Sequence, residues 1–501
     1  MTTAHIRTDV LIIGAGAAGL FAALHLPEGT DTIVVDKGRK GAGSSNWAQG
    51  GLAAALGPED SPELHAEDTI RVAAGHADLS AVQVLCYEAP ECVMELVELG
   101  CELDREPGGD LHLAREGGQS VARSVHAGDA TGAAIMKTLR AHAIDRVRRI
   151  EGVCIELAVV DGRCGGGWIL TDEGLVQIQA NSIVLATGGI GALYPSTTNP
   201  AGATGDGIVL AWEAGAGLAD VEFVQFHPTA LSAGDTNQRV LITEALRGAG
   251  AFVVDSEGRR FLFDYHSDGE LAPRDVVARA IAQRHSWLDA RHIPQKLLEE
   301  EFFTVVEGCR RHGIDPVKDL IPIAPAAHYF VGGVQTDLDG RASIPRLYSV
   351  GECSNTGAHG ANRLPGNSLA EALVFGRRAA RAIAGQRSGR VKHLPADPVL
   401  KDLNIPLAEA WDALHQMTSK ALWIEREGES LRKAGEALEE FALLPLSPDR
   451  GALELRSAAI MARLIAHAAL LRTESRGGHH RSDYPAPDPG WAGVRLRIAR
   501  N

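Results

Sequence analysis

The sequence lacks any long apolar run. Its 501 residues contain no stretch of the roughly 18 apolar residues that a membrane-spanning helix requires, so no membrane partner is predicted. The first eight residues lack the charged and then apolar pattern of a signal peptide. The seven cysteines are odd in number and form no C-x-x-C pair, which argues against a disulfide framework and an iron–sulfur cluster. These absences predict a protein of the reducing cytoplasm.

The sequence also lacks an excess of positive charge. It has 49 Lys and Arg against 64 Asp and Glu, which gives a net charge of −15. A nucleic-acid backbone is bound by a basic face, so a nucleic-acid partner is excluded, whereas a small anionic substrate needs only a few local cations. The composition is that of a globular protein, and the length predicts more than one domain.

A glycine-rich turn follows the first apolar segment. Residues 10–13 are predicted to form a buried strand and residues 20–26 a helix. The turn between them matches G-x-G-x-x-G and consists of Gly14, Ala15, Gly16, Ala17, Ala18 and Gly19. Such a turn brings the backbone and a helix N-terminus against a pyrophosphate. A second strand, residues 32–35, leads to Asp36, where a carboxylate can bind a ribose hydroxyl.

The segment after the second strand is polar and rich in glycine. It is predicted to be a loop on the side of the sheet where ligands bind, although a purely structural turn is the alternative. The predicted cofactor contacts here are Lys37, Ser44, Ser45, Asn46, Trp47, Ala48, Gln49, Gly50 and Gly51.

Later strands end in similar turns. Residues 182–186 and 347–350 are predicted strands that close with glycines, which is typical of a two-part dinucleotide-binding domain. Ser368 and Glu371 form an S-x-x-E pattern that predicts a capping box and a helix from Leu369 to about residue 383. The further predicted cofactor contacts are Cys154, Thr187, Gly188, Asp206, Glu352, Ser368 and Leu369.

Periodicity predicts the remaining elements. The predicted helices are residues 63–72, 81–99, 133–148, 208–214, 276–285, 406–419, 421–443 and 451–473. The predicted strands lie within residues 151–180, with turns at 161–162 and 165–167, at 221–226, and in a hairpin of 252–255 with 260–263. Residues 287–320 are predicted to be helical or irregular, and residues 194–207 a long polar loop. The His and Arg cluster at residues 474–481 has no ligand spacing, so no metal site is predicted.

A series of motifs in order along nearly the whole chain resembles the fumarate reductase and succinate dehydrogenase flavoprotein superfamily, and within it the L-aspartate oxidase family. The motifs are residues 14–19, 48–51, 115–118, 225–229, 243–248, 272–275, 328–329 with 332–333, 359–363 and 367–369. The resemblance implies bound FAD, a capping domain over the flavin and a four-carbon dicarboxylate substrate.

The implied fold class is an α/β FAD-binding Rossmann-like domain with an inserted α+β capping domain and a C-terminal three-helix bundle. The expected divisions are 1–237 and 329–390 for the FAD-binding domain, 238–328 for the capping domain, 400–480 for the bundle and 481–501 for a tail. Two positions separate the subfamilies. Ser44 stands where the respiratory enzymes carry the histidine that bonds the flavin, so a non-covalent flavin is expected. Glu116 stands where they carry an apolar residue, and a carboxylate there suits a substrate with an ammonium group.

The resemblance implies oxidation of L-aspartate to iminosuccinate. Arg363, His227, His328 and Thr243 are the candidate carboxylate binders, although a single histidine is more often a satisfied core residue. Arg363 suits a carboxylate best because a guanidinium pairs with it bidentately. Glu116 would take the ammonium, and Arg274 would act electrostatically in oxidation and as a proton donor toward fumarate, with Glu244 nearby.

O2, with release of H2O2, or fumarate would accept the electrons, and the product would feed a quinolinate synthase in the first step of NAD biosynthesis. Two alternatives remain. One is a soluble fumarate reductase or a succinate dehydrogenase-type flavoprotein, and the other is a flavin-bearing binding or sensor protein without turnover.

Overall fold

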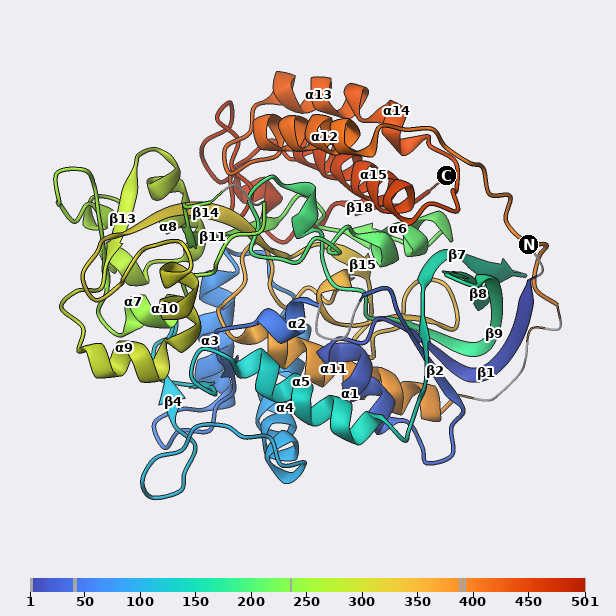
Figure 1. Cartoon of the computed structure of the whole chain (residues 1–501), viewed down its shortest axis with the longest axis horizontal. Helices are drawn as coiled ribbons and strands as arrows, with labels where there is room; N and C mark the ends of the chain where they lie inside the picture. Colours follow the sequence, from blue (N-terminus) through green and yellow to red (C-terminus); the bar gives the residue numbers. More distant parts are fainter. Residues whose placement is uncertain (1–2, 39–42, 235–236, 387–390, 392, 501) are drawn as a thin grey trace.

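The architecture is that of a computed structural model, in which residues 3–38, 43–234, 237–386, 391 and 393–500 are described. Its largest sheet has seven strands in the order β6-β2-β1-β9-β8-β7, with β16 beside β9 (Figure 1). The strands are β1 (Ala4–Ile13), β2 (Thr32–Asp36), β6 (Arg148–Glu151), β7 (Val153–Val160), β8 (Arg163–Thr171), β9 (Gly174–Leu185) and β16 (Leu347–Ser349). β1 pairs in parallel with β2 and β9, whereas β7, β8 and β9 are antiparallel.

Alternate residues of β1 bury two opposite faces of this sheet. Val10 and Ile12 pack on one face with residues of several helices, and Leu11 and Ile13 pack on the other face with α6 and the C-terminal helices. The main helices of the first face are α1 (Ala17–His25), α4 (Leu79–Glu98), α5 (Thr131–Ala143) and α11 (Asn367–Ala384). Those of the second face are α6 (Asp206–Glu213), α12 (Leu407–Ala421), α13 (Gly428–Ala437), α14 (Glu439–Ala442) and α15 (Arg450–Leu471). Figure 1 shows the two groups at the bottom and the top.

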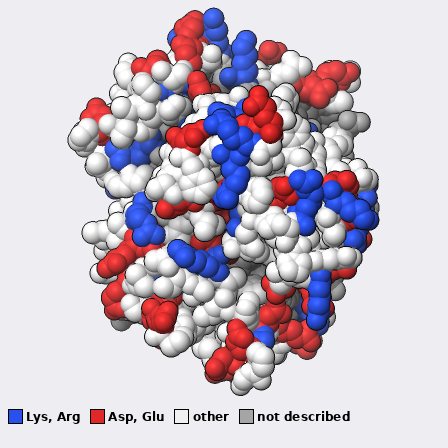
Figure 2. Space-filling model, turned by 90° about the vertical axis from the view of Figure 1, so that its left-hand side faces the viewer, with Lys and Arg blue, Asp and Glu red and all other residues white. Residues whose placement is uncertain are grey.

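A separate lobe, at the left of Figure 1, has its own apolar core. Its sheet has the order β11-β14-β13-β12. The lobe consists of β11 (Val224–Leu231), α7 (Glu244–Gly248), β12 (Phe252–Val254), α8 (Arg274–Ala282), β13 (Ser286–Asp289), α9 (Gln295–Glu301), α10 (Phe303–Arg310) and β14 (Ile321–Phe330). Figure 2 views this side, where acidic and basic side chains are interspersed.

The remaining elements are short. They are α2 (Ser44–Trp47), β3 (Leu52–Ala53), α3 (Pro62–Val72), β4 (Leu113–Ala114), β5 (Ser124–Val125), β10 (Leu218–Ala219), β15 (Gly333–Gln335), β17 (Ser354–Asn355) and β18 (Arg497–Ile498). The 3-10 turns are η1 (Gly191–Leu193), η2 (Leu262–Asp264), η3 (Gly269–Leu271), η4 (Gly351–Cys353) and η5 (Pro489–Trp491). None of the described helices combines the length and apolarity that crossing a membrane requires.

Several sequence predictions about the first half of the chain are wrong in detail. The helix predicted at 133–148 ends at Ala143, and a turn at 144–147 leads into the exposed edge strand β6, which begins at Arg148 and whose charged sequence has no apolar alternation. The glycines at 165–167 lie inside β8 and not in a turn. Gly166 is needed there, since a Cβ would lie 2.0 Å from the Ile178 carbonyl oxygen. The segment predicted as a loop at 44–51 begins with the helical turn α2.

Predictions about the lobe are also inexact. The strand predicted at 221–226 is shifted to β11, which continues through Pro228 because the pairing with β14 is irregular between His227 and Ala230. The hairpin predicted for 252–255 with 260–263 is reduced to one antiparallel bridge between Val254 and Arg260. β12 pairs mainly with β13, which lies at the start of the segment predicted to be helical or irregular.

The capping box predicted at Ser368 is also wrong. α11 already begins at Asn367 after Gly366, whose φ is +82°, and no side chain caps it. Glu371 instead accepts hydrogen bonds from Tyr329 and Thr356. The helix predicted at 421–443 is divided, because α12 ends at Ala421 and α13 and α14 follow.

Candidate active site

One pocket of about 590 Å³ gathers nearly all of the predicted site residues. All of them line it except Gly19 and Asn46. Gly19 serves close packing, because a Cβ there would lie 2.2 Å from the Gly14 carbonyl oxygen. Asn46 turns away, and its Oδ1 accepts a hydrogen bond of 3.1 Å from Arg140 on α5. We call the part around Gly14, Asp36 and Lys37 the glycine end.

We call the opposite set of residues the arginine end of the pocket. It consists of Glu116, His227, Thr243, Glu244, Arg274, His328 and Arg363. These residues come from six separate stretches of the chain and are all buried or nearly so. The sequence motifs therefore converge on one site, as their residue types suggested.

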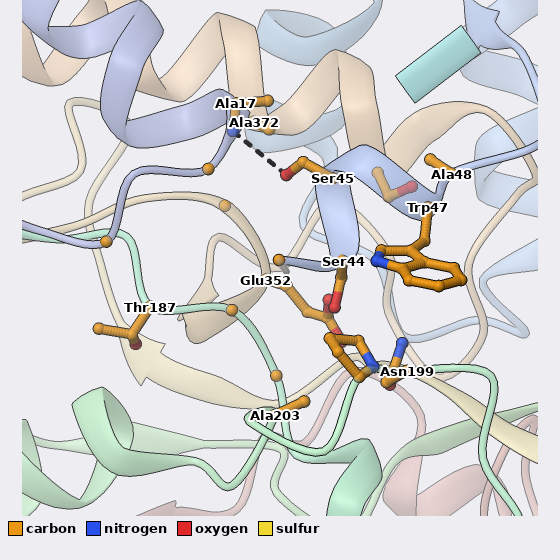
Figure 3. A pocket seen from close by; sticks show the side chains of 18 of the residues that line it. Ala17, Ser44, Ser45, Trp47, Ala48, Thr187, Asn199, Ala203, Glu352 and Ala372 are labelled. Atoms are coloured by element: carbon orange, nitrogen blue, oxygen red, sulfur yellow. Dashed lines mark hydrogen bonds between the residues drawn. The ribbon is translucent and has the colours of Figure 1, made fainter. Parts of the chain in front are cut away.

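At the glycine end, the backbone determines most of the shape of the pocket. Gly14 has a φ of +112°, and a Cβ on it would lie 2.1 Å from the Ala186 carbonyl oxygen, so only glycine fits this turn. The first turn of α1 follows, and its Ala17 N–H donates to Ser45 Oγ at 3.1 Å (Figure 3). Ser45 on α2 thus fixes the polar segment against the glycine turn. Thr187, just after β9, and Asn199, in the loop after residues 191–193, line the same cavity.

The groups around the glycine turn fit a flavin dinucleotide. Asp36 lies at the end of β2, where a carboxylate can take ribose hydroxyls, and burial raises its pKa. Gln49 Oε1 is buried without a hydrogen-bond partner among the described residues, so it remains an acceptor for a ligand. Burial raises the pKa of Glu352 to about 7, and this carboxyl packs so closely on Gly189 that a Cβ would lie 2.1 Å away.

Arg274 is the centre of a buried charge network at the arginine end. It is the first residue of α8, and its Nε lies 2.6 Å from Glu244 Oε2. Arg247 Nη2 lies 3.2 Å from the other oxygen of Glu244. Burial raises the pKa of Glu244, but the two arginines outweigh this effect and hold it below its ordinary value. The carboxylate is therefore ionised and links two guanidinium groups.

Two histidines face each other beside Arg274. The ring centroids of His227 and His328 are 5.0 Å apart, and Thr198 Oγ1 lies 2.8 Å from His328 Nδ1. Burial, reinforced by Arg274, lowers the pKa of both rings well below the usual value. Both imidazoles are therefore neutral at physiological pH and can offer an N–H to an anion without carrying a charge.

Arg363 is the second buried arginine that lines the arginine end. Its guanidinium carbon lies 4.5 Å from the centroid of the Tyr329 ring, and its Nη1 donates to Ser368 Oγ at 3.2 Å. Burial, together with the charge of Arg274, lowers its pKa to about 10, so the side chain stays protonated at neutral pH. Its Nε is buried without a hydrogen-bond partner among the described residues. A free donor on a buried cation suits a carboxylate ligand.

Glu116 is the acid that completes the arginine end. Its Oε1 accepts a hydrogen bond of 3.1 Å from the Gly51 N–H, which ties it to the predicted cofactor segment. Burial raises its pKa, although Arg274 opposes this effect. A cationic group on a ligand would favour the ionised form further.

The sequence assigned no role to some residues that line the pocket, such as Tyr329, or that contact its lining, such as Gln225 and Arg247. Gln225 accepts a hydrogen bond of 3.0 Å from Arg274 Nη1, and it was quoted in a motif without a role. The same holds for Arg247 and Tyr329, whose positions in motifs were the available signal. Arg450 also lines the pocket, and no motif pointed to it.

Comparisons with known proteins agree with this geometry. The model of an FAD binding domain matches residues 9–369, and the model of the fumarate reductase flavoprotein C-term matches residues 450–497. Among solved structures, a variant of E. coli quinol fumarate reductase FrdA superposes with a TM-score of 0.91 at 30% identity, covering 99% of this chain and 96% of that chain.

Relatives with curated names are closer in sequence. An L-aspartate oxidase of Caulobacter vibrioides is 44% identical over 97% of this chain and 95% of the relative. An L-aspartate oxidase of Nostoc sp. is 42% identical over 96% of this chain and 92% of the relative. The FAD-binding flavoprotein fold with a C-terminal helical domain is thus confirmed. The chain belongs to the L-aspartate oxidase family of FAD-binding flavoproteins.

Proposed function

We propose that the protein oxidises L-aspartate to iminosuccinate with FAD as its cofactor, and that O2 or fumarate takes the electrons. The observation that carries this proposal is the combination of buried Glu116 with buried Arg274 and Arg363 on one pocket. Aspartate has one ammonium and two carboxylates, and each finds an oppositely charged partner there. The names of the relatives support the same substrate.

The roles of the side chains follow from their charges. Arg363 would pair with one carboxylate through its unpartnered donor, and neutral His227 and His328, with the Thr243 hydroxyl, would bind the other. Glu116 would hold the ammonium and accept its proton, which gives the neutral amine from which hydride can leave. A succinate molecule would leave Glu116 without a partner, which disfavours it as a substrate.

Arg274 would act by charge and by proton transfer. FAD, when bound, supplies the acceptor for the hydride that leaves the aspartate Cα. Arg274 would stabilise the carboxylate beside that carbon during oxidation. When fumarate is the acceptor, Arg274 would donate the proton and regain it through Glu244, which also contacts Arg247.

We also propose that the flavin is held without a covalent bond. Ser44 lines the pocket at the position expected for a bonding histidine, and a hydroxyl is a poor substitute. Cys154 is the thiol on the pocket wall, and burial raises its pKa, so little thiolate forms. Precipitation with acid should release free FAD into the supernatant, and yellow colour retained in the pellet would refute non-covalent binding.

The predicted division into domains supports a mobile cap. We propose that residues 238–328 close over the FAD-binding parts at 1–237 and 329–390, because Arg274 and Arg363 approach one pocket from different segments. A dicarboxylate should then protect residues 238–328 from protease. Equal cleavage with and without fumarate would argue against closure.

The cellular role is proposed from the reaction. Iminosuccinate is unstable in water and needs a consuming enzyme, for which a quinolinate synthase of NAD biosynthesis is the proposed partner. The seven free, buried thiols are compatible with a cytoplasmic location.

Anaerobic mixing with L-aspartate tests the function. The flavin absorbance should bleach with L-aspartate and stay unchanged with succinate. Bleaching by succinate alone would establish the fumarate reductase or succinate dehydrogenase-type alternative. Bleaching by neither would favour a flavin-bearing binding protein.

A further inference from the structure

One residue of the C-terminal helices reaches the pocket. Among the described residues that line it, Arg450 is the only one beyond Ala372 in sequence. Arg450 is the first residue of α15, which packs in the core on one face of the largest sheet. Its side chain is 47% exposed, so it stands at the margin of the pocket and not in its interior.

A chain of ionic contacts joins Arg450 to the glycine end. Arg450 Nε lies 3.2 Å from Glu454 Oε1, and the same oxygen lies 3.3 Å from Lys37 Nζ. Lys37 also pairs with Asp206 and donates to Thr204 Oγ1 at 2.9 Å. Three separate parts of the chain therefore meet here: the end of β2, the start of α6 and the first turns of α15.

The position of this cluster identifies the part of the cofactor that it faces. Lys37 directly follows Asp36 at the end of β2, which is where a dinucleotide-binding fold places the adenosine ribose. The acids and arginines proposed to bind substrate belong to the arginine end. The Arg450 cluster thus lies on the adenosine side of the pocket.

We propose that α15 completes the adenosine subsite of FAD, with Arg450 as a binding residue and Glu454 as a positioning residue. Arg450 adds positive charge on the outer side of a diphosphate ligand, and Glu454 holds both Arg450 and Lys37 in place. The C-terminal helices are then part of the cofactor site, and FAD binding stabilises their docking. This inference rests on FAD occupying the pocket and is independent of the substrate.

Affinities of the apoprotein for FAD, ADP and FMN test the proposal, because ADP carries only the adenosine part and FMN only the flavin part. Arg450→Gln should lower the affinities for FAD and ADP by a common factor of roughly three to ten and leave the affinity for FMN within about two-fold of the wild-type value. Arg450→Lys keeps the charge and should restore most of the affinity. Glu454→Gln should produce a smaller loss of the same kind.

Arg463→Gln is the matched control. Arg463 also lies on α15 and pairs with a single glutamate, Glu439, at 3.2 Å, but it does not line this pocket. Its removal should leave all three affinities unchanged. The proposal is overturned if Arg450→Gln binds FAD like the wild type, or if FMN is weakened as much as FAD. Failure of the wild type itself to bind FAD would refute the cofactor and not this subsite alone.

Discussion

The two ends of the pocket are built in opposite ways. At the glycine end, a contiguous backbone turn does the shaping, and the charged side chains Lys37 and Arg450 are partly exposed. At the arginine end, side chains from distant segments meet, and Arg274, Glu244 and Arg363 are buried. At the glycine end, cofactor binding is therefore distributed over many weak contacts. At the arginine end, substrate binding depends on a few buried charges.

This difference has an energetic consequence. Buried charges pay a desolvation cost that only well-placed partners offset, so removing one member leaves the others uncompensated. Substitutions at the arginine end should therefore have large effects on substrate chemistry. Substitutions of single side chains at the glycine end should have small effects on cofactor affinity, because backbone contacts remain.

The largest effect is expected for Arg274→Leu. Loss of this charge should slow flavin reduction by L-aspartate by about a thousand-fold, which is typical when a preorganised electrostatic partner is removed. FAD affinity should stay within about two-fold, because Arg274 belongs to the other end of the pocket. Rapid-mixing absorbance and FAD titration measure the two quantities. A variant with full turnover and only weaker substrate binding would show that Arg274 has no catalytic role.

Arg363→Lys should have a smaller but selective effect. Lysine keeps the charge but lacks the fork that pairs with a carboxylate, so fumarate binding should weaken by about a hundred-fold. Perturbation of the flavin spectrum by fumarate gives the affinity. Equal loss of FAD binding in this variant would contradict the separation of the two ends.

The pH dependence should distinguish aspartate from dicarboxylates. The ionised form of Glu116 attracts the ammonium, so aspartate affinity is present above its pKa and is lost as pH falls through it. Because burial raises that pKa, the loss begins at higher pH than for an exposed glutamate, and the KM rises by about ten-fold per pH unit below it.

Fumarate binding to the oxidised enzyme is the control for this profile. Fumarate has no ammonium, and His227 and His328 are already neutral because their pKa values lie well below the usual one. The affinity of the enzyme for fumarate should therefore not fall over the pH range in which the affinity for aspartate is lost. Parallel losses for aspartate and fumarate would show that another group controls both.

The sequence predicted the glycine end nearly as it stands. Residues 10–36 form strand, turn and helix because a local pattern of apolar residues and glycines dictates them. It also named the main residues of the arginine end, but through family motifs. No local rule could place Arg274 within 2.6 Å of Glu244, since that contact depends on how the lobe packs.

Two errors of the sequence-based prediction have the same physical origin. Ser368 and Glu371 match a capping pattern, but buried Glu371 finds better partners in Tyr329 and Thr356 once the chain is folded. Arg450 carries no motif, because its part in the pocket arises only when α15 docks beside Lys37. Tertiary contacts decide both cases, and a linear pattern does not contain them. The exact division into domains stays a prediction.

The central claim is that Glu116 makes the arginine end selective for an amino dicarboxylate. The most direct measurement compares wild type with Glu116→Gln, using anaerobic flavin reduction by L-aspartate and fumarate affinity on the same samples. The variant should be reduced by aspartate at least about a hundred-fold more slowly at low substrate concentration, while it binds fumarate as tightly or more tightly. Reduction by aspartate at the wild-type rate would contradict the claim.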